Sequence, residues 1–536
     1  MSSSGRVFLR EATGLVRSLT AFDAYALGIV GITPGVTIVL WYVYITFLYP
    51  GADMVWTAIG SLPIGLVYAG GYYLMSISMP RSGGEYVWGS RIIHPLWGFL
   101  PNWMYMYAQV FCLGYLAATI GGGYLAPYLS ILASFYNNPS LGNWASTVSS
   151  PNGAFALSLA VIWVSLLINI RGIRAYAAAT AIMFVIAMAG VVLTFVLLAT
   201  TNNQAFQAAF NHYAASYNTS YQGIIDLAES NGWKPQPPAF DQTSFALVYM
   251  AGTSLATAWP VLAAGEIRAP QKSMFWGTVG AVLTSGVIFV LGAVLFYNTV
   301  GDTFAKAFSF VAFSGSVTNP LPAAPYIQYL TSMVTQNSAI IFFLGFSYVV
   351  WIIIIMPAYY VIISRSMFAW SFDRLLPSLF ANISDRLHAP INALCITALI
   401  GTFAAYLTVY TTILGFVFNI TLAVVSSFVF VGIAAAVFPY SKKARKIYES
   451  APAIVRTNIG GLPLITVLGV IIAAVFAWMT YLGLISPALS GPVNPASVTL
   501  WIGVYVTAIV LYFVAKAYHK RHGLDIDLAF QEIPPE

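Results

Sequence analysis

Residues 28–35 read GIVGITPG and lie inside an apolar stretch that extends over residues 21–48. A stretch of this length can cross a bilayer, because about 20 apolar residues with a rise of about 1.5 Å each span the hydrocarbon core. Proline has no N–H and clashes with the preceding turn of a helix, and glycine adds backbone freedom. The sequence therefore predicts a membrane-spanning helix that unwinds at residues 31–35.

A second run of small and polar residues, MAGTSLATAWP, occupies residues 250–260 at about the middle of the apolar stretch 243–264. If ten helices form two repeats of five, the two runs lie in the first helix of each repeat. A single break often signifies only a kink or close packing. A matched pair is typical of secondary transporters, which bind substrate where two helices break. The pair therefore predicts a binding site.

The composition identifies lipid as the solvent of most of the chain. Of the 536 residues, 59% are hydrophobic and 7% are charged, whereas about a quarter of the residues in a soluble domain are charged. Twelve segments are long and apolar enough to span a membrane: residues 21–48, 55–79, 96–125, 155–170, 176–199, 243–264, 277–300, 339–367, 391–409, 414–438, 462–484 and 498–516. The predicted fold class is an all-α integral membrane protein with 12 transmembrane helices.

The positive charges predict the orientation. All but two of the 22 Lys and Arg residues, Lys234 and Lys306, fall on the side of the two termini, which the positive-inside rule assigns to the cytoplasm. The predicted parts are a cytoplasmic N-terminus (1–20), a first repeat (21–200), an extracytoplasmic loop (201–242), a second repeat (243–440), a cytoplasmic loop (441–461), two further helices (462–516) and a cytoplasmic tail (517–536). A multi-pass protein of the cell membrane is expected.

The sequence offers no sign of enzyme chemistry. We find no His cluster for haem, no Cys spacing for a metal and no phosphate-binding loop. The charged residues lie at helix ends or in loops, so no acid or base is predicted near the bilayer centre, where such groups mark ion paths. Cys112 and Cys395 lie in apolar stretches and suggest no disulfide. We expect no cofactor or metal, and membrane lipid and a small solute as the partners.

The candidate site lies at the two breaks. N–H groups at the start of a half-helix would hold a carboxylate, and carbonyl groups at the end of one would hold an ammonium group or Na+. A zwitterion needs no charged side chain there, which favours a neutral amino acid. The candidate residues are Gly31, Ile32, Thr33, Pro34, Gly35, Gly252, Thr253, Ser254, Ala256 and Thr257 at the breaks and Tyr107 and Gln109 in the third helix. Trp259 is either a gate or a bulky packing residue.

Several short motifs carry a family resemblance over residues 14–441. They are GLVR (14–17) with FDA (22–24), PRSGGEY (80–86), IRGIR (170–174), GEIRAPQK (265–272), and Ser364-Arg365 with DRLLP (373–377) and Pro390. In this order they resemble the amino acid-polyamine-organocation (APC) superfamily of amino acid permeases. The resemblance implies a LeuT-type fold of five plus five inverted repeats, with broken helices 1 and 6, and transport by alternating access.

The resemblance also implies residue roles. Residues 32–35 match the glycine segment of the family that binds the substrate carboxylate, but Pro34 replaces a residue that could donate an N–H. Residues 256–258, Ala-Thr-Ala, replace the common glycine-aromatic-acid run of the sixth helix. Ala187 occupies the position where some proton-coupled members carry a lysine. Na+ or H+ stays open as the coupling ion, with Ser347 as a weak candidate cation ligand.

Other functions stay open at this point. One is a transporter of polyamines or other organic cations of the same superfamily, which is disfavoured because no acid lines the predicted site. Another is a receptor that binds amino acids without moving them. The particular amino acid, uptake as against exchange, and the oligomeric state do not follow from the sequence.

Overall fold

The computed structural model describes residues 17–384, 386–411, 420–486 and 495–530. Twelve helical segments within these ranges are long and apolar enough to cross a membrane. This confirms the predicted fold class and number of spans. Parts of three predictions lie outside the described residues: the N-terminus over 1–16, which includes the first three residues of the GLVR motif, the start of the tenth span at 414–419, and the end of the tail at 531–536.

The first five spans contain one break and one wide turn. The spans are α1 (Ala21–Ile32) with α2 (Pro34–Leu48), α3 (Met54–Ser78), α5 (Pro95–Thr119) with α6 (Ala126–Phe135), α8 (Pro151–Ile170) and α9 (Ile173–Thr200). The π-helical turn η1 (Ile120–Leu125) joins α5 to α6, so the third span is longer than the predicted 96–125. Its glycines explain the turn, because a side chain at Gly121 would collide with the carbonyl oxygen of Val148.

The next five spans contain the second break. They are α12 (Phe240–Thr253) with η3 (Ser254–Thr257) and α13 (Ala258–Leu262), α14 (Pro270–Phe275) with η5 (Trp276–Gly280) and α15 (Ala281–Val300), α18 (Ser338–Phe372), α19 (Ile391–Tyr410) and α21 (Ile420–Val437). The last two are α23 (Leu464–Ile485) and α25 (Pro495–Arg521).

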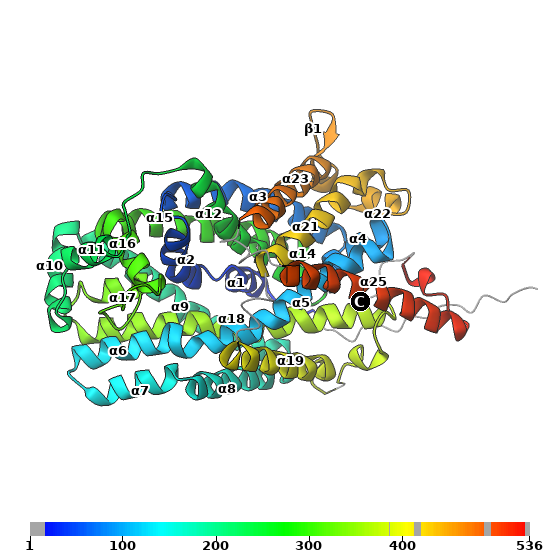
Figure 1. The fold of residues 1–536 in the computed structure, drawn as a ribbon. Helices are drawn as coiled ribbons and strands as arrows, with labels where there is room; N and C mark the ends of the chain where they lie inside the picture. The colour runs from blue at the N-terminus through cyan, green and yellow to red at the C-terminus, as the bar shows by residue number, and fades with distance from the viewer. Residues whose placement is uncertain (1–16, 385, 412–419, 487–494, 531–536) are drawn as a thin grey trace, which may run out of the picture.

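Shorter elements lie at the two ends of the bundle. They are α4 (Glu85–Ile92), α7 (Pro139–Ser149), α10 (Asn203–Ala214), η2 (Ala215–Tyr217), α11 (Tyr221–Ser230), η4 (Ala264–Glu266), α16 (Asp302–Phe313), α17 (Ile327–Ser332), η6 (Ser378–Phe380), η7 (Phe438–Tyr440), α22 (Arg445–Ser450), η8 (Ala453–Arg456), the antiparallel strands β1 (Asn458–Ile459) and β2 (Leu462–Pro463), and η9 (Ile526–Phe530). Figure 1 shows α10, α11 and α16 at one end, the α10 end, and α4 and α22 towards the other, the α4 end.

The two broken spans are the most buried of the twelve. In the first span 89% of the most apolar 18-residue window is buried, and in the sixth 72%, whereas the last span has 17%. A helix that is apolar on all sides can lie either in lipid or in the protein interior. The packing therefore places both breaks in the centre of the molecule and α25 at its edge.

The segment 201–242, predicted as an extracytoplasmic loop, is largely helical, and the segment 301–337 between the seventh and eighth spans contains α16 and α17. Phe304 of α16 stacks on Tyr221 of α11 with the ring centroids 4.1 Å apart, and Phe210 of α10 lies edge-on to it at 4.9 Å. Lys306, one of the two exceptions to the charge asymmetry, is buried and pairs with Asp302 at 3.0 Å. These segments thus form a packed cap with its own aromatic core.

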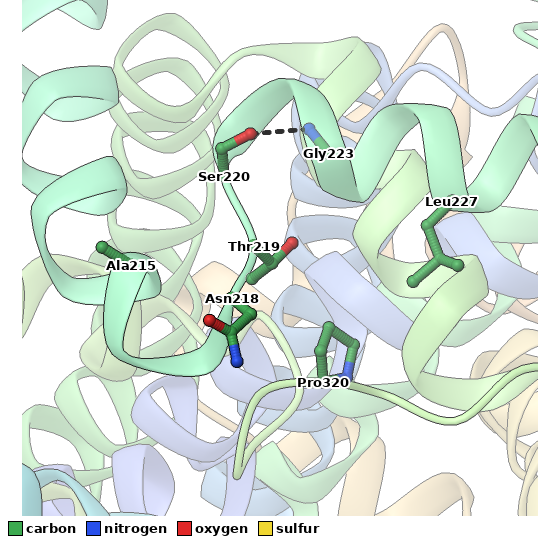
Figure 2. A pocket seen from close by; sticks show the side chains of 7 residues that line it. All are labelled: Ala215, Asn218, Thr219, Ser220, Gly223, Leu227 and Pro320. Carbon is green, nitrogen blue, oxygen red and sulfur yellow. Dashed lines mark hydrogen bonds between the residues drawn. The ribbon is translucent and has the colours of Figure 1, made fainter.

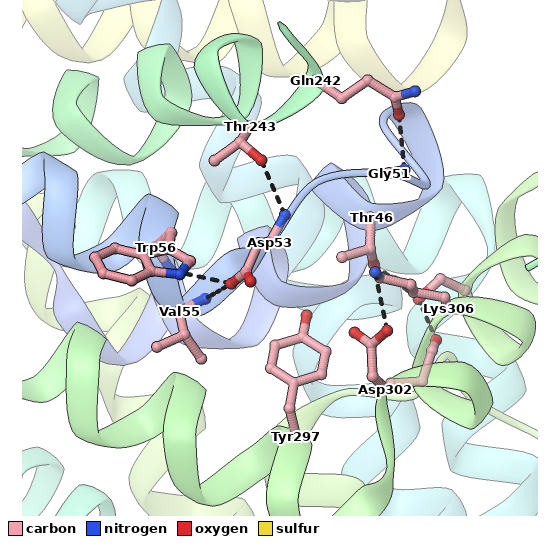
Figure 3. A network of polar contacts seen from close by, with 12 residues as sticks. Thr46, Gly51, Asp53, Val55, Trp56, Gln242, Thr243, Tyr297, Asp302 and Lys306 are labelled. Carbon is pink, nitrogen blue, oxygen red and sulfur yellow. Dashed lines mark hydrogen bonds and ion pairs between the residues drawn. The ribbon is translucent and has the colours of Figure 1, made fainter. Parts of the chain in front are cut away.

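The turn between the first two spans is tied to the start of the sixth span. Gly51 donates its N–H to the side-chain oxygen of Gln242 at 2.7 Å, and Asp53 donates its N–H to Thr243 Oγ1 at 3.2 Å. The Asp53 carboxylate also caps the start of α3. Figure 3 shows these contacts beside the Asp302–Lys306 pair. They hold the start of α12 in place relative to α2.

Candidate functional site

The first break is confined to a single residue. Thr33 takes a left-handed conformation (φ 47°, ψ 58°) and ends α1, and Pro34 begins α2 at once. Proline is tolerated in the first turn of a helix, where its missing N–H would have no partner. The prediction of unwinding over residues 31–35 is therefore too wide: Gly31 and Ile32 stay helical in α1, and Pro34 and Gly35 are helical in α2.

The second break is a tightening of the helix. α12 ends at Thr253, residues 254–257 form a 3₁₀ turn, and α13 follows. Tyr68 of α3 donates its hydroxyl hydrogen to the Leu255 carbonyl at 3.1 Å. The predicted break is present, but the backbone at the break winds more tightly as a 3₁₀ helix and does not unwind.

The two breaks touch each other. A β-carbon added at Gly31 would lie 2.7 Å from the carbonyl oxygen of Ala256 and 3.0 Å from the ring of Trp259. Only glycine lets the backbones approach this closely. None of Gly31, Ala256 and Trp259 carries a charge.

The start of α2 presents unused donors. Pro34 has no N–H, and among the described residues no hydrogen bond uses the N–H of Gly35 or of Val36. Both residues are buried. The first N–H groups of a helix lack partners within it and carry the positive end of its dipole. This helix start can therefore accept an anionic group one residue beyond the break.

Gly35 faces the eighth span. A side chain there would collide with the indole ring of Trp351 in α18, and Trp351 donates its N–H to the carbonyl of Ala187 at 2.9 Å. Ser347, one turn before Trp351, packs against Gly190 of α9 and donates to Leu344 O at 2.8 Å. The structure therefore places Ser347 in the contact between α9 and α18 rather than at the two breaks.

The candidate residues of the sixth span divide between two faces. Gly252, Thr253 and Ala256 are half-buried, and no atom lies within 4 Å of a β-carbon added at Gly252. Ser254 and Thr257 are buried, and Ser254 packs against Gly65 of α3. Within the described residues the Thr257 hydroxyl has no hydrogen-bond partner. The face with Gly252 borders open space.

Trp259 connects the breaks to the third and eighth spans. Its indole N–H donates to Tyr105 Oη at 3.0 Å, and its ring lies edge-on to Tyr359 with centroids 5.0 Å apart. Tyr359 donates to Cys112 Sγ at 3.1 Å. Trp259 is 1% exposed and belongs to a packed cluster beside the breaks.

The two candidates on α5 point in different directions. Gln109 lies four residues after Tyr105 and three before Cys112, so it shares the face that meets Trp259 and Tyr359. It is buried, and its side chain forms no hydrogen bond with any described residue. Tyr107 instead lines an apolar pocket of about 290 Å³ with Trp103 and Trp370. The prediction that Tyr107 faces the site is corrected, because α5 presents it to α18 and α19 on another side.

Two buried ion pairs lie at the α4 end, and none of their residues was among the predicted site residues. Arg365 of α18 binds both carboxylate oxygens of Glu266 at 2.6 and 3.1 Å. Arg91 binds both oxygens of Asp373 at 2.6 and 2.9 Å. All four residues lie at helix ends or close to them, as expected, but they are buried rather than solvated. Three of them, Glu266, Arg365 and Asp373, lie within the motif stretches, and this was the available signal.

The ends of the broken spans are also joined there. Ser18 and Leu19 donate their N–H groups to the Glu266 carbonyl at 2.9 Å, and Arg268 donates its N–H to the Leu19 carbonyl at 2.9 Å. This short parallel contact links the start of α1 to the segment after α13.

A separate pocket of about 420 Å³ opens at the α10 end (Figure 2). Asn218, Thr219 and Ser220 line it with Leu227 and Pro320. Ser220 caps α11 through the N–H of Gly223 at 3.0 Å. This pocket lies between helices of the cap and includes no residue of the two breaks.

Comparison with protein-family models gives one finding. The model of the family described as "Amino acid permease" matches residues 33–527, which is most of the chain and includes both breaks.

Proposed function

This chain belongs to the amino acid permease family, and we propose that it carries neutral amino acids across the cell membrane by alternating access. The family is one of transporters rather than enzymes. In the proposal both termini are cytoplasmic, residues 21–200 and 243–440 form the two inverted repeats, and substrate binds between the breaks of the first and sixth spans.

The observation that carries the proposal is the pair of unused N–H groups at Gly35 and Val36. They lie at a buried helix start directly after the break at Thr33, and Gly31, on the other side of that break, touches the second break. A substrate carboxylate would satisfy them and would be favoured by the helix dipole. The N–H groups of Gly35 and Val36 thus take the place of the N–H that Pro34 cannot supply.

The chemistry of the contact favours a zwitterion. Residues 31–36 and 252–259 contain no charged side chain. A cationic substrate would leave its extra charge without a compensating acid, which is costly away from water. Gln109 supplies a neutral polar group on the adjoining face of α5.

The first test is uptake into proteoliposomes that contain only this protein. Neutral, basic and acidic amino acids and polyamines are compared with and without gradients of Na+ or H+. Saturable uptake of neutral amino acids is expected. Transport of polyamines instead would overturn the charge argument, and binding without any flux would identify a receptor.

The site is tested by Gly252→Leu. A β-carbon there meets open space, so the variant is expected to fold and to bind substrate more weakly. Gly503→Leu is the matched control, since a β-carbon at Gly503 also meets open space but lies on α25. Unchanged affinity in Gly252→Leu would remove the sixth-span face from the site. Gly35→Leu is unsuitable, because collision with Trp351 would itself disturb the fold.

A further inference from the structure

A buried acid lies beside the second break and is used by none of the contacts described above. Glu85 is the first residue of α4, between the second and third spans, and is 3% exposed. The preceding loop is fixed to the sixth span, because Gly83 donates its N–H to the Leu262 carbonyl at 3.0 Å. Gly84, with φ +46°, packs against Val261 of α13.

Glu85 has one polar side-chain partner, and the pair is incomplete. Asn102 of α5 donates its amide hydrogen to Glu85 Oε1 at 2.8 Å. Glu85 Oε2 and Asn102 Oδ1 are both buried, and neither has a hydrogen-bond partner within the described part of the chain. Two buried acceptors without a donor are costly.

A single proton on Glu85 would give both of these oxygens a hydrogen-bond partner. A carboxylic acid and a primary amide pair through two hydrogen bonds, one from the acid O–H to the amide oxygen and one from the amide N–H to the other acid oxygen. The second of these bonds is already present between Asn102 and Glu85 Oε1, and a hydrogen on Oε2 would supply the first. A metal cation fits less well, because oxygen-bound cations such as Ca²⁺ take about six to eight ligands and this pair offers two.

The surroundings favour the neutral acid. The titratable groups that lie close enough to feel a charge on Glu85 are the hydroxyls of Tyr68 and Tyr72 on α3 and Tyr105 on α5. The neighbouring elements α13 and α21 contain no titratable residue, and Arg91 on α4 itself is bound to Asp373. Burial raises the pKa of Glu85 to about 7, against the lowering effect of its hydrogen bonds to its own backbone N–H and to Asn102.

The pair is connected to the substrate site. Asn102 and Tyr105 are three residues apart on α5, and Tyr105 accepts the hydrogen bond of Trp259, which touches Gly31. A change of charge at Glu85 therefore acts on groups that pack against both breaks.

We propose that Glu85 and Asn102 form a proton-binding site and that H+ is the coupling ion of this permease. The inference rests on the proposed function. Oε2 takes its proton from water on one side of the membrane and releases it to water on the other, and no bond other than that O–H is made or broken.

The transport test uses Glu85→Gln in proteoliposomes. The glutamine amide can donate to Asn102 Oδ1, so it imitates the protonated acid but cannot release a proton. We expect wild-type protein to accumulate a neutral amino acid when the outside is acidic. The variant is expected to lose this accumulation while it retains substrate binding in detergent and exchange of labelled for unlabelled substrate.

Glu229→Gln is the matched control, because Glu229 is exposed on α11. It should leave accumulation unchanged. Proton-driven accumulation by Glu85→Gln, or accumulation in wild-type protein that follows only a Na+ gradient, would overturn the proposal.

A second measurement does not depend on transport. Infrared difference spectra recorded against pH should show a carboxylic acid band that disappears as the pH rises through about 7 and that is missing in Glu85→Gln. If wild-type protein lacks this band, Glu85 binds no proton and the proposal fails. If the band titrates but no substrate is bound or moved, the proposed transport function fails while the proton site stands.

Discussion

At the scale of single residues, the glycines of the first span serve contact between elements. Gly31 lets α1 approach the carbonyl of Ala256, and Gly35 leaves room for the ring of Trp351. The residue that takes the left-handed conformation is Thr33, which is β-branched and unfavourable there. Pro34 explains why the chain turns at Thr33, since a helix that ran through it would need an N–H that proline lacks.

Gly31→Ala should weaken the fold through this contact. The added carbon lies 2.7 Å from a backbone oxygen that cannot rotate away, and overpacking of this kind costs about 1–3 kcal/mol. The measurement is thermal unfolding in detergent. Gly252→Ala is the control, because its added carbon meets nothing. Equal melting temperatures for the two variants would contradict the close contact of the breaks.

The pKa of Glu85 predicts a pH dependence of stability. Its pKa is raised from 4.5 to about 7 in the folded protein, so the folded state holds the proton more tightly than the unfolded state does. The stability from this group is therefore fully present below about pH 4.5 and is lost as the pH rises to about 7. Melting temperatures of wild-type protein minus those of Glu85→Gln should fall across this window. A constant difference would contradict the raised pKa.

At the scale of elements, apolar length and helix-breaking residues locate the spans and their interruptions. They do not show how far an interruption extends: the first is one residue long, and the second is a 3₁₀ turn. Amphipathic segments outside the spans were also missed as helices. The helices α10, α11 and α16 form because their aromatic residues bury one another. These contacts join the segments 201–242 and 301–337, so neither segment shows them when it is considered alone.

Phe304→Ala tests that cap. Phe304 is fully buried between Tyr221, Phe206 and Phe210, and removal of a buried phenylalanine side chain costs about 3–5 kcal/mol. Thermal unfolding should shift to lower temperature. Phe240→Ala is the control, since Phe240 is 89% exposed. A cap that is only loosely attached would instead show the same melting temperature for both variants.

At the scale of the whole molecule, buried charges fasten the α4 end. The Arg91–Asp373 pair joins α4 to the end of α18, and Tyr86 donates to Asp373 Oδ2 at 2.7 Å. The segment η9 closes over this pair: the ring of Phe530 lies 5.0 Å from the Arg91 guanidinium, and Lys516 pairs with Asp527 at 2.6 Å. The Glu266–Arg365 pair fastens the sixth span to α18 in the same region.

Asp373→Asn should destabilise this end strongly. It leaves the buried Arg91 charge uncompensated, and breaking a buried pair costs about 3–5 kcal/mol. In a double-mutant cycle with Arg91→Gln, the double variant should be more stable than the sum of the single losses predicts. Glu449→Gln is the control, because its ion pair with Arg445 is exposed and should matter little. Additive losses would show that the two charges are not coupled.

The sequence by itself determined the number of spans, the membrane as solvent and the positions of both breaks. These are local properties: a span needs only length and apolarity, and proline and glycine act on their own turn of helix. The match to the amino acid permease family confirms the resemblance that the short motifs carried.

Only the tertiary structure decided which side chains meet. A span in lipid is apolar around its whole circumference, so no alternation of polar and apolar residues marks its inner face. Helical spacing puts Tyr107 and Gln109, two residues apart, on different faces of α5. The sequence could not show which of the two faces the breaks, and it could not place Ser347 against Gly190. From the sequence alone, Glu85 is expected to lie in a loop between two spans. Its burial beside Asn102 follows from the packing of α4 between spans that are distant along the chain, because desolvation depends on all neighbours in space.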